Sequence, residues 1–258
     1  MLLLLPPSEG KAATPRRGKP LDLAALSFPE LTATRERVLR ELVTLCADRD
    51  KAVDVLGLTP GLAGEVDKDA GLLDAPTVPA AALYTGVLYD ALSVSTLDAA
   101  ARRRATRQLV VVSALFGALR MTDRVPSYRL SMDVALPGTG PLASVWREPL
   151  AEVLPAAAGN GLVVDLRSAT YAAAWRPGRD LAPRTVAVRV LREEGGKRSV
   201  VSHMAKHTRG EVARHLLETG AAPRTPEALA DALSERWTVE LPDARRGAAR
   251  TLDVVLVA

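Results

Sequence analysis

The sequence is poor in cysteine and in aromatic residues. Of its 258 residues, one is a cysteine, Cys46, and 3% are aromatic, whereas 48% are hydrophobic. The core must therefore be aliphatic, built mostly from Leu, Val and Ala. A single cysteine excludes an internal disulfide, and with no signal peptide it indicates a reduced, cytoplasmic setting. Cys46 lies in the apolar stretch LRELVTLC, which favours a buried structural thiol over a nucleophile.

The N-terminal apolar run is short. Four leucines at residues 2–5 have no basic residue before them and run into Pro6-Pro7. A signal peptide has a basic region followed by about 7–15 apolar residues, and a membrane span needs about 20. We therefore interpret the run as a buried strand that the prolines end, and we expect no membrane partner.

Several familiar motifs are missing. Gly10-Lys11 is not a phosphate loop, because an earlier glycine is absent and Ala12 follows the lysine. Neither G-x-S-x-G nor G-x-G-x-x-G occurs, which weighs against a hydrolase of that class and against a dinucleotide enzyme. His203 and His207 have the spacing of zinc ligands, but H-E-x-x-H is absent and the cation of Lys206 opposes a metal. We predict no metal site and no cofactor.

Strand and helix patterns are interspersed along the chain. Continuous apolar runs predict strands at 2–5, 108–114, 161–166, 185–191, 198–203 and 251–258. Helical spacing predicts helices over 29–50, 79–92, 97–107 and 204–218, the third capped by Ser95 or Thr96. Residues 193–197 predict a hairpin turn. We predict an α/β fold in one compact domain, residues 1–258, with a mixed β-sheet flanked by helices.

Polar side chains follow four of the predicted strands. They are Ser8, Glu9 and Lys11; Arg120, Asp123, Tyr128 and Arg129; Arg167, Ser168 and Tyr171; and Lys206, His207 and Arg209. Ligands of open α/β sheets bind at the carboxyl ends of strands, and guanidinium and hydroxyl groups suit an anion. The alternative is that these are ordinary polar loops. The chain has 28 arginines and six lysines, so each lysine is the more informative.

The net charge of +4 and the pI near 9.4 indicate a mild preference for anionic partners. Arg16-Arg17-Gly18-Lys19 is a dense basic cluster near the start of the chain, and Arg102–Arg104 is a second one. We interpret the second cluster as a solvated helix face.

Five segments resemble the YaaA family of bacterial peroxide-stress resistance proteins. They are PPSEGK (6–11), LYTGVLYDAL (83–92), SALFGALRMTDRVPSYRLSM (113–132), VVDLRSATY (163–171) and SHMAKHTRG (202–210). Other members have a Ser-Pro-Ala-Lys version of the first segment, so Lys11 aligns whereas Ser8 is displaced. The third segment is the most specific of the five.

The resemblance implies a cytoplasmic protein that limits the damage done by loosely held iron under peroxide. It also implies DNA binding through a positively charged cleft and a helix-hairpin-helix-like element at about residues 36–70, where this chain carries the acidic Glu65, Asp67 and Asp69. The ligand-binding residues it carries over are Ser8, Lys11, Tyr84, Thr85, Arg120, Asp123, Tyr128, Arg129, Ser168, Tyr171, Lys206 and Arg209.

Three functions are compatible with these residues. The first is a stress protein that binds double-stranded DNA. The second is an enzyme acting on a small anionic or nucleobase-like metabolite, with Lys11, Tyr128 and Lys206 as candidate catalytic groups. The third, an iron-binding protein, has the least support, because no ligand cluster has metal spacing. The residues do not indicate an oligomeric state.

Overall fold

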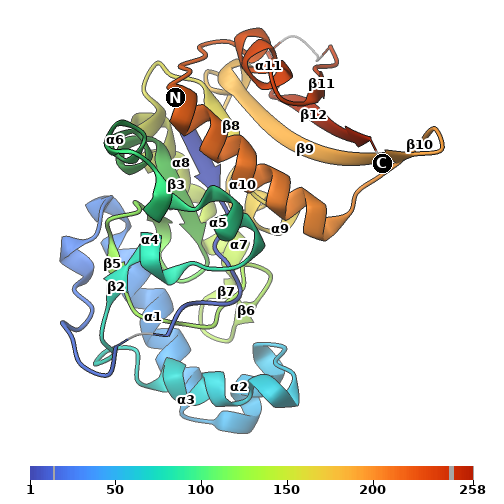
Figure 1. Cartoon of the computed structure of the whole chain (residues 1–258). Helices are drawn as coiled ribbons and strands as arrows, with labels where there is room; N and C mark the ends of the chain where they lie inside the picture. Colours follow the sequence, from blue (N-terminus) through green and yellow to red (C-terminus); the bar gives the residue numbers. More distant parts are fainter. Residues whose placement is uncertain (14, 244–246, 258) are drawn as a thin grey trace.

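The main sheet has eight strands among the residues that the computed structural model describes, which are 1–13, 15–243 and 247–257. Their order is β11-β12-β9-β8-β1-β3-β4, and β10 pairs with β9. β12, β9, β8, β1 and β3 run parallel, whereas β4, β10 and β11 pair antiparallel. The predicted α/β fold with a mixed, helix-flanked sheet is confirmed (Figure 1). The strands are β1 Leu2–Leu5, β3 Leu109–Ser113, β4 Gly117–Leu119, β8 Val163–Asp165, β9 Thr185–Glu194, β10 Lys197–Ser199, β11 Thr238–Glu240 and β12 Arg250–Val257.

The leucine run forms β1, an interior strand of the sheet's parallel part. All four residues of β1 are buried, and the strand pairs with β3 on one side and β8 on the other. Strands covered on both faces read as continuous apolar runs, which explains LLLL and the valines of β3. Two small antiparallel pairs lie outside this sheet, formed by β2 Val78–Pro79 with β5 Arg124–Val125 and by β6 Ala135–Leu136 with β7 Gly140–Pro141.

The order of the strands creates a crevice at β1. The chain passes from β1 to β3 on one side and only later to β8 on the opposite side of β1. Connections that leave a strand in opposite directions open a crevice outside its carboxyl end, the usual ligand position in open α/β sheets. Residues 6–11 follow β1 directly and therefore enter this crevice.

Helices cover the sheet, and three of them, α1, α2 and α3, lie at the end of the molecule away from β11 and β12 (Figure 1). No helix in the described part of the chain is long and apolar enough to cross a membrane. The helices are α1 Thr32–Cys46, α2 Arg49–Val55, α3 Gly64–Ala70, α4 Ala80–Leu83, α5 Val87–Leu92, α6 Ala99–Gln108, α7 Leu142–Val145, α8 Arg147–Ala158, α9 Ala169–Ala172, α10 Ser202–Thr219 and α11 Pro226–Ser234, with 3-10 turns η1 Leu23–Ala25, η2 Pro29–Leu31, η3 Pro60–Leu62, η4 Val94–Thr96 and η5 Ala182–Arg184.

Two predicted helices are interrupted. The helix expected over 29–50 gives η2, α1 and the start of α2, and the break at Asp48 arises because its carboxylate caps α2 by accepting from Lys51 N. The helix expected over 79–92 is α4 and α5. Gly86, with φ +92°, separates them in a conformation that L-residues rarely adopt. This second break leaves Tyr84 and Thr85 in a loop.

Two further predictions are wrong in detail. The cap of α6 is Asp98, which accepts from Ala101 N at 2.7 Å, and neither Ser95 nor Thr96. The strand expected over 198–203 ends early, because β10 stops at Ser199 and α10 begins at Ser202. The last predicted strand is β12, which ends at Val257, and Ala258 lies outside the described residues.

A candidate anion-binding site

Two adjoining pockets open at the carboxyl end of β1. Their volumes are about 490 and 510 Å³, and Ser8, Glu9 and Tyr171 line both. We call the two together the strand-end cleft; the first, which contains Lys11, is the Lys11 pocket, and the second, which contains Arg209, is the Arg209 pocket. The charged residues lining the cleft are the cations Lys11, Arg129, Lys206 and Arg209 and the carboxylates Glu9 and Asp133. The cleft is therefore cationic.

The Lys11 side chain is half-buried at the base of its pocket. Its Nζ lies 4.1 Å from the centroid of the Tyr128 ring and donates to Ser8 O at 3.1 Å. The backbone is held by a bridge between Lys11 and Tyr84 and by the bond from Ala12 N to Leu83 O. Burial lowers the pKa of Lys11 to about 8, the charge of Arg129 acts in the same direction, and Asp69 opposes them. The amine is therefore still mostly charged at pH 7, but its neutral fraction is far larger than that of an ordinary lysine.

A chain of hydroxyl groups lies beneath Lys11. The Tyr128 hydroxyl is 2.7 Å from Ser113 Oγ and 3.0 Å from the Tyr84 hydroxyl. Ser113 Oγ also accepts from the backbone N–H groups of Leu115 and Phe116. Burial raises the pKa of Tyr84 and of Tyr128 well above 10, so both phenols stay protonated. The chain fixes the ring on which the lysine rests.

Replacing Tyr128 with Phe tests this support. We expect Tyr128→Phe to lower the free energy of unfolding by about 1–3 kcal/mol, because the buried hydroxyls of Ser113 and Tyr84 lose their shared partner. Tyr84→Phe is the matched control: it removes one end of the chain, leaves the bond between Ser113 and Tyr128, and should cost less. Urea unfolding of the three proteins measures this, and equal losses would contradict the shared role of Tyr128.

Asp69 lies near Lys11 and Arg129, although the sequence marks it only as an acidic residue of the helix-hairpin-helix-like element. It is fully buried at the end of α3, its Oδ1 accepts from Arg129 N at 2.9 Å, and its Oδ2 has no partner among the described residues. Burial raises the pKa of Asp69 to about 7, while the Arg129 N–H and the charge of Lys11 pull it down. An aspartate that follows Asp67 and Lys68 in DKDA resembles a solvated helix residue, so no sequence signal marks its burial.

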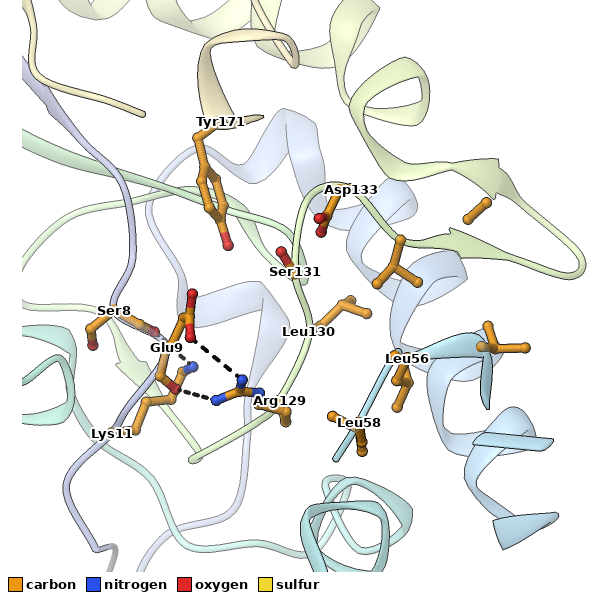
Figure 2. A pocket seen from close by; sticks show the side chains of 14 residues that line it. Ser8, Glu9, Lys11, Leu56, Leu58, Arg129, Leu130, Ser131, Asp133 and Tyr171 are labelled. Atoms are coloured by element: carbon orange, nitrogen blue, oxygen red, sulfur yellow. Dashed lines mark hydrogen bonds and ion pairs between the residues drawn. The ribbon is translucent and has the colours of Figure 1, made fainter. Parts of the chain in front are cut away.

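Arg129 and Glu9 form the rim of the Lys11 pocket. The guanidinium lies 3.6 Å from the Glu9 carboxylate and donates to Glu9 O at 3.3 Å. Figure 2 shows these contacts together with the bond from Lys11 to Ser8, and it shows the Tyr171 hydroxyl pointing into the pocket between Glu9 and Ser131. Burial is the main cause that raises the pKa of Tyr171, to about 12, so this phenol is a hydrogen-bond donor at neutral pH.

The Arg209 pocket is bounded by α5, α9 and α10. Ser8 Oγ accepts from Thr85 N at 3.1 Å, and Tyr89 donates to Pro6 O at 2.7 Å, which ties the loop after β1 to α5. Lys206 and Arg209 enter from α10, in agreement with the helix predicted over 204–218, although the strand predicted before them ends at Ser199. Burial lowers the pKa of Arg209, and Asp165 opposes that shift.

Most of the predicted site residues meet at the cleft, and two do not. Ser8, Lys11, Thr85, Arg129, Ser168, Tyr171, Lys206 and Arg209 line it, and Tyr84 and Tyr128 lie beneath Lys11. Arg120 instead donates to Arg107 O and Leu109 O near the opposite end of β3. Asp123 accepts from Ser27 N and Arg120 N and stabilises a turn. Ligand binding by the cleft residues stays a prediction.

The histidine pair is on the surface of α10. His203 and His207 are both exposed, and His207 Nδ1 lies 3.3 Å from a Glu211 carboxylate oxygen. In the described ranges, no group of three or more His, Cys, Asp or Glu side chains is arranged to hold a metal ion.

The protein has a mostly parallel α/β sheet and a cationic cleft at the carboxyl end of β1. These two features define its class, an α/β protein with a candidate anion site. The chain belongs to the YaaA family, since the family model described as peroxide stress protein YaaA matches residues 1–241. It is 57% identical to a UPF0246 protein of Streptomyces coelicolor over 99% of this chain and 98% of the relative. A UPF0246 protein of Corynebacterium efficiens is 42% identical over 95% and 97%.

Proposed function

We propose that this chain is a cytoplasmic protein of the peroxide stress response that limits iron-dependent damage and binds DNA through its strand-end cleft. Membership of the family supports the stress role. The observation that supports an anionic partner is the gathering of Lys11, Arg129, Lys206 and Arg209 around one cleft whose lining has two carboxylates. Cations placed in this way neutralise phosphates and release counterions.

The proposed helix-hairpin-helix-like element adjoins the same cleft. α2 and α3 are joined by a loop that contains η3, and the first residues of that loop, Leu56–Leu58, line the Lys11 pocket. Between residues 36 and 70 the acidic side chains outnumber the basic ones, with Glu36, Glu41, Asp48, Asp50, Asp54, Glu65, Asp67 and Asp69 against Arg37, Arg40, Arg49, Lys51 and Lys68. Phosphate contact from this element must therefore come from backbone N–H groups of the loop, as at other nest-like anion sites.

The salt dependence of DNA binding tests this proposal. We expect the logarithm of the affinity for a labelled duplex to fall linearly with the logarithm of the salt concentration, by about 0.9 per phosphate neutralised. In the double variant Lys206→Ala/Arg209→Ala that slope should become less steep by about 2, because two phosphate contacts are lost. Titration of both proteins at four or more salt concentrations measures it.

The control is Arg103→Ala/Arg107→Ala, two exposed arginines on one face of α6. α6 leads into the amino end of β3, whereas the cleft lies at the carboxyl ends of the strands. This variant should therefore keep the wild-type salt dependence of DNA binding. Equal effects of the two double variants would contradict a DNA surface at the cleft, as would no binding by the wild type at modest salt.

A second candidate function is an enzyme acting on a small anionic or nucleobase-like metabolite. The half-buried amine of Lys11, with its pKa lowered to about 8 by burial, favours it. A lysine that only contacts a backbone phosphate can stay fully charged. A lysine that acts as a base or a nucleophile must be partly neutral. Each pocket also lies within the range of about 300–1,000 Å³ that small-molecule sites occupy.

A further inference from the structure

Among the six lysines of the chain, Lys11 has distinctive surroundings. Its Nζ rests on the face of the Tyr128 ring, and among the described residues its recorded hydrogen bond goes to a neutral carbonyl, Ser8 O. No carboxylate oxygen of the described residues lies within the 4.0 Å of an ion pair to it. Lys68 shows the contrast, since it is exposed and paired with Glu65. Lys11 is thus a primary amine taken out of water without a direct counter-ion, which favours its neutral, nucleophilic form.

The groups around this amine suit a ligand that carries both an anionic group and an electrophilic carbonyl carbon. Arg129 stands at the rim with its guanidinium partly occupied by the exposed carboxylate of Glu9, so a phosphate can displace that long contact. Tyr171 extends a protonated hydroxyl into the same pocket from the opposite wall (Figure 2). The pocket volume of about 490 Å³ accepts a sugar phosphate.

We propose that Lys11 forms an imine with the carbonyl carbon of an open-chain sugar phosphate held in the cleft by Arg129. The inference rests on the second candidate function and names its substrate class. The ligand chemistry is an aldehyde or ketone a few bonds from a phosphate ester. That chemistry has two sources, a free sugar phosphate and the open-chain deoxyribose at a site in DNA that has lost its base.

The covalent step needs no oxidant or reductant. The Nζ lone pair attacks the carbonyl carbon, the C=O π bond breaks, and one proton passes from Nζ to the former carbonyl oxygen, which gives a neutral carbinolamine. Tyr171 supplies a hydrogen bond to that oxygen. The nitrogen lone pair then expels the hydroxyl group, which leaves with a proton as water and leaves a C=N bond. Addition of water reverses the sequence and restores the amine.

The pH dependence follows from the charges that face the amine. Asp69 and Glu65 from α3 and Glu9 favour the charged amine, whereas burial and Arg129 favour the neutral one, and the neighbouring phenols of Tyr84 and Tyr128 stay protonated. Burial outweighs the carboxylates, so the pKa is lowered to about 8. The rate of imine formation should therefore rise with pH up to about pH 8 and level off above it.

Borohydride trapping tests the proposal. The full chain is incubated with ribose 5-phosphate, or with a DNA duplex that contains one abasic site, then reduced with cyanoborohydride and digested for mass spectrometry. We expect an adduct on Lys11 at least tenfold above that on Lys51 or Lys197, retained in Lys197→Arg and lost in Lys11→Arg. Labelling in the first arm identifies a free sugar phosphate as the source, and labelling in the second arm alone identifies DNA.

Binding is measured separately with partners that cannot form an imine, glycerol 3-phosphate and a duplex with a tetrahydrofuran abasic analogue. If these bind while Lys11 is labelled no more than the other lysines, the imine proposal is overturned and the anion site stands. If neither binds and Lys11 is not preferentially labelled, both fail. Because the adduct is mapped in the wild-type protein, the result does not depend on the folding of a variant.

Discussion

Replacing Arg35 with Met should lower the free energy of unfolding by about 3–5 kcal/mol. Arg35 is fully buried on α1, and its Nε donates to Phe116 O at 2.9 Å. Its Nη2 donates to Ser27 O at 2.7 Å and to Ala118 O at 2.8 Å. Methionine fills much of the volume but donates to none of these, so three carbonyl groups lose a charge-assisted donor.

The substitution also removes a positive charge near the buried carboxylate of Asp123. Asp123 lies close enough to Arg35 for its charge to counter the fall that burial imposes on the arginine pKa, and Asp123 is itself buried. Urea unfolding measures the effect, with Arg37→Met as the control, because Arg37 is exposed on the same helix and should change stability by no more than about 0.5 kcal/mol. A loss below about 1 kcal/mol for Arg35→Met would contradict the role given to its hydrogen bonds.

Replacing Gly210 with Ala should also destabilise the protein, by about 2 kcal/mol. Gly210 lies on α10 where that helix crosses α5, and a Cβ atom there would fall 2.1 Å from Leu88 O and 2.9 Å from Ala91 Cβ. Alanine gains about 1 kcal/mol over glycine in helix propensity, but a clash with backbone cannot be relieved by rotating a side chain, so the clash prevails.

The same substitution should weaken ligand binding, because α10 carries Lys206 and Arg209 and α5 lines the same pocket. Gly64→Ala in α3 is the matched control, since nothing lies within 4 Å of a Cβ at that position. Its stability should be unchanged or slightly raised. Thermal unfolding of both variants and anion binding by both measure the two effects. A Gly210→Ala protein as stable as the wild type would contradict this prediction, because it would mean that α5 and α10 can move apart without loss of stability.

The sequence predicts the frame of this site better than its details. The leucines of β1 and the valines of β3 form continuous apolar runs, and the prolines after β1 mark where a buried strand ends. Because the position of a ligand follows from where parallel strands end, the sequence analysis located Ser8, Lys11 and Ser168 at one edge. The predictions fail mainly where tertiary contacts decide, whereas the cap of α6 is a local choice in which Asp98 prevails over Ser95 and Thr96.

The remaining misses arise from tertiary contacts. Arg120 and Asp123 follow a strand in sequence, but β4 turns back antiparallel beside β3 and carries them away from the cleft. Asp69 joins the site because α3 packs near Lys11 and Arg129, a long-range contact that no local pattern records. Burial of a polar residue is a property of the packed fold, so the altered pKa values of Lys11 and Asp69 could not be predicted from the sequence.

Direct titration of the six lysines is the most immediate test of the strand-end cleft as a desolvated anion site. In protein labelled with ¹³C at lysine Cε, NMR spectra collected from pH 6 to pH 12 follow each amine separately, and Lys11→Arg assigns its signal. The Lys11 signal should titrate near pH 8, below the ordinary lysine value of about 10.4, because burial of the amine disfavours its charged form. Addition of inorganic phosphate should raise that midpoint, since a bound anion favours the charged amine. If the Lys11 signal titrates above pH 10, Lys11 is an ordinary solvated lysine and the cleft is not the site described.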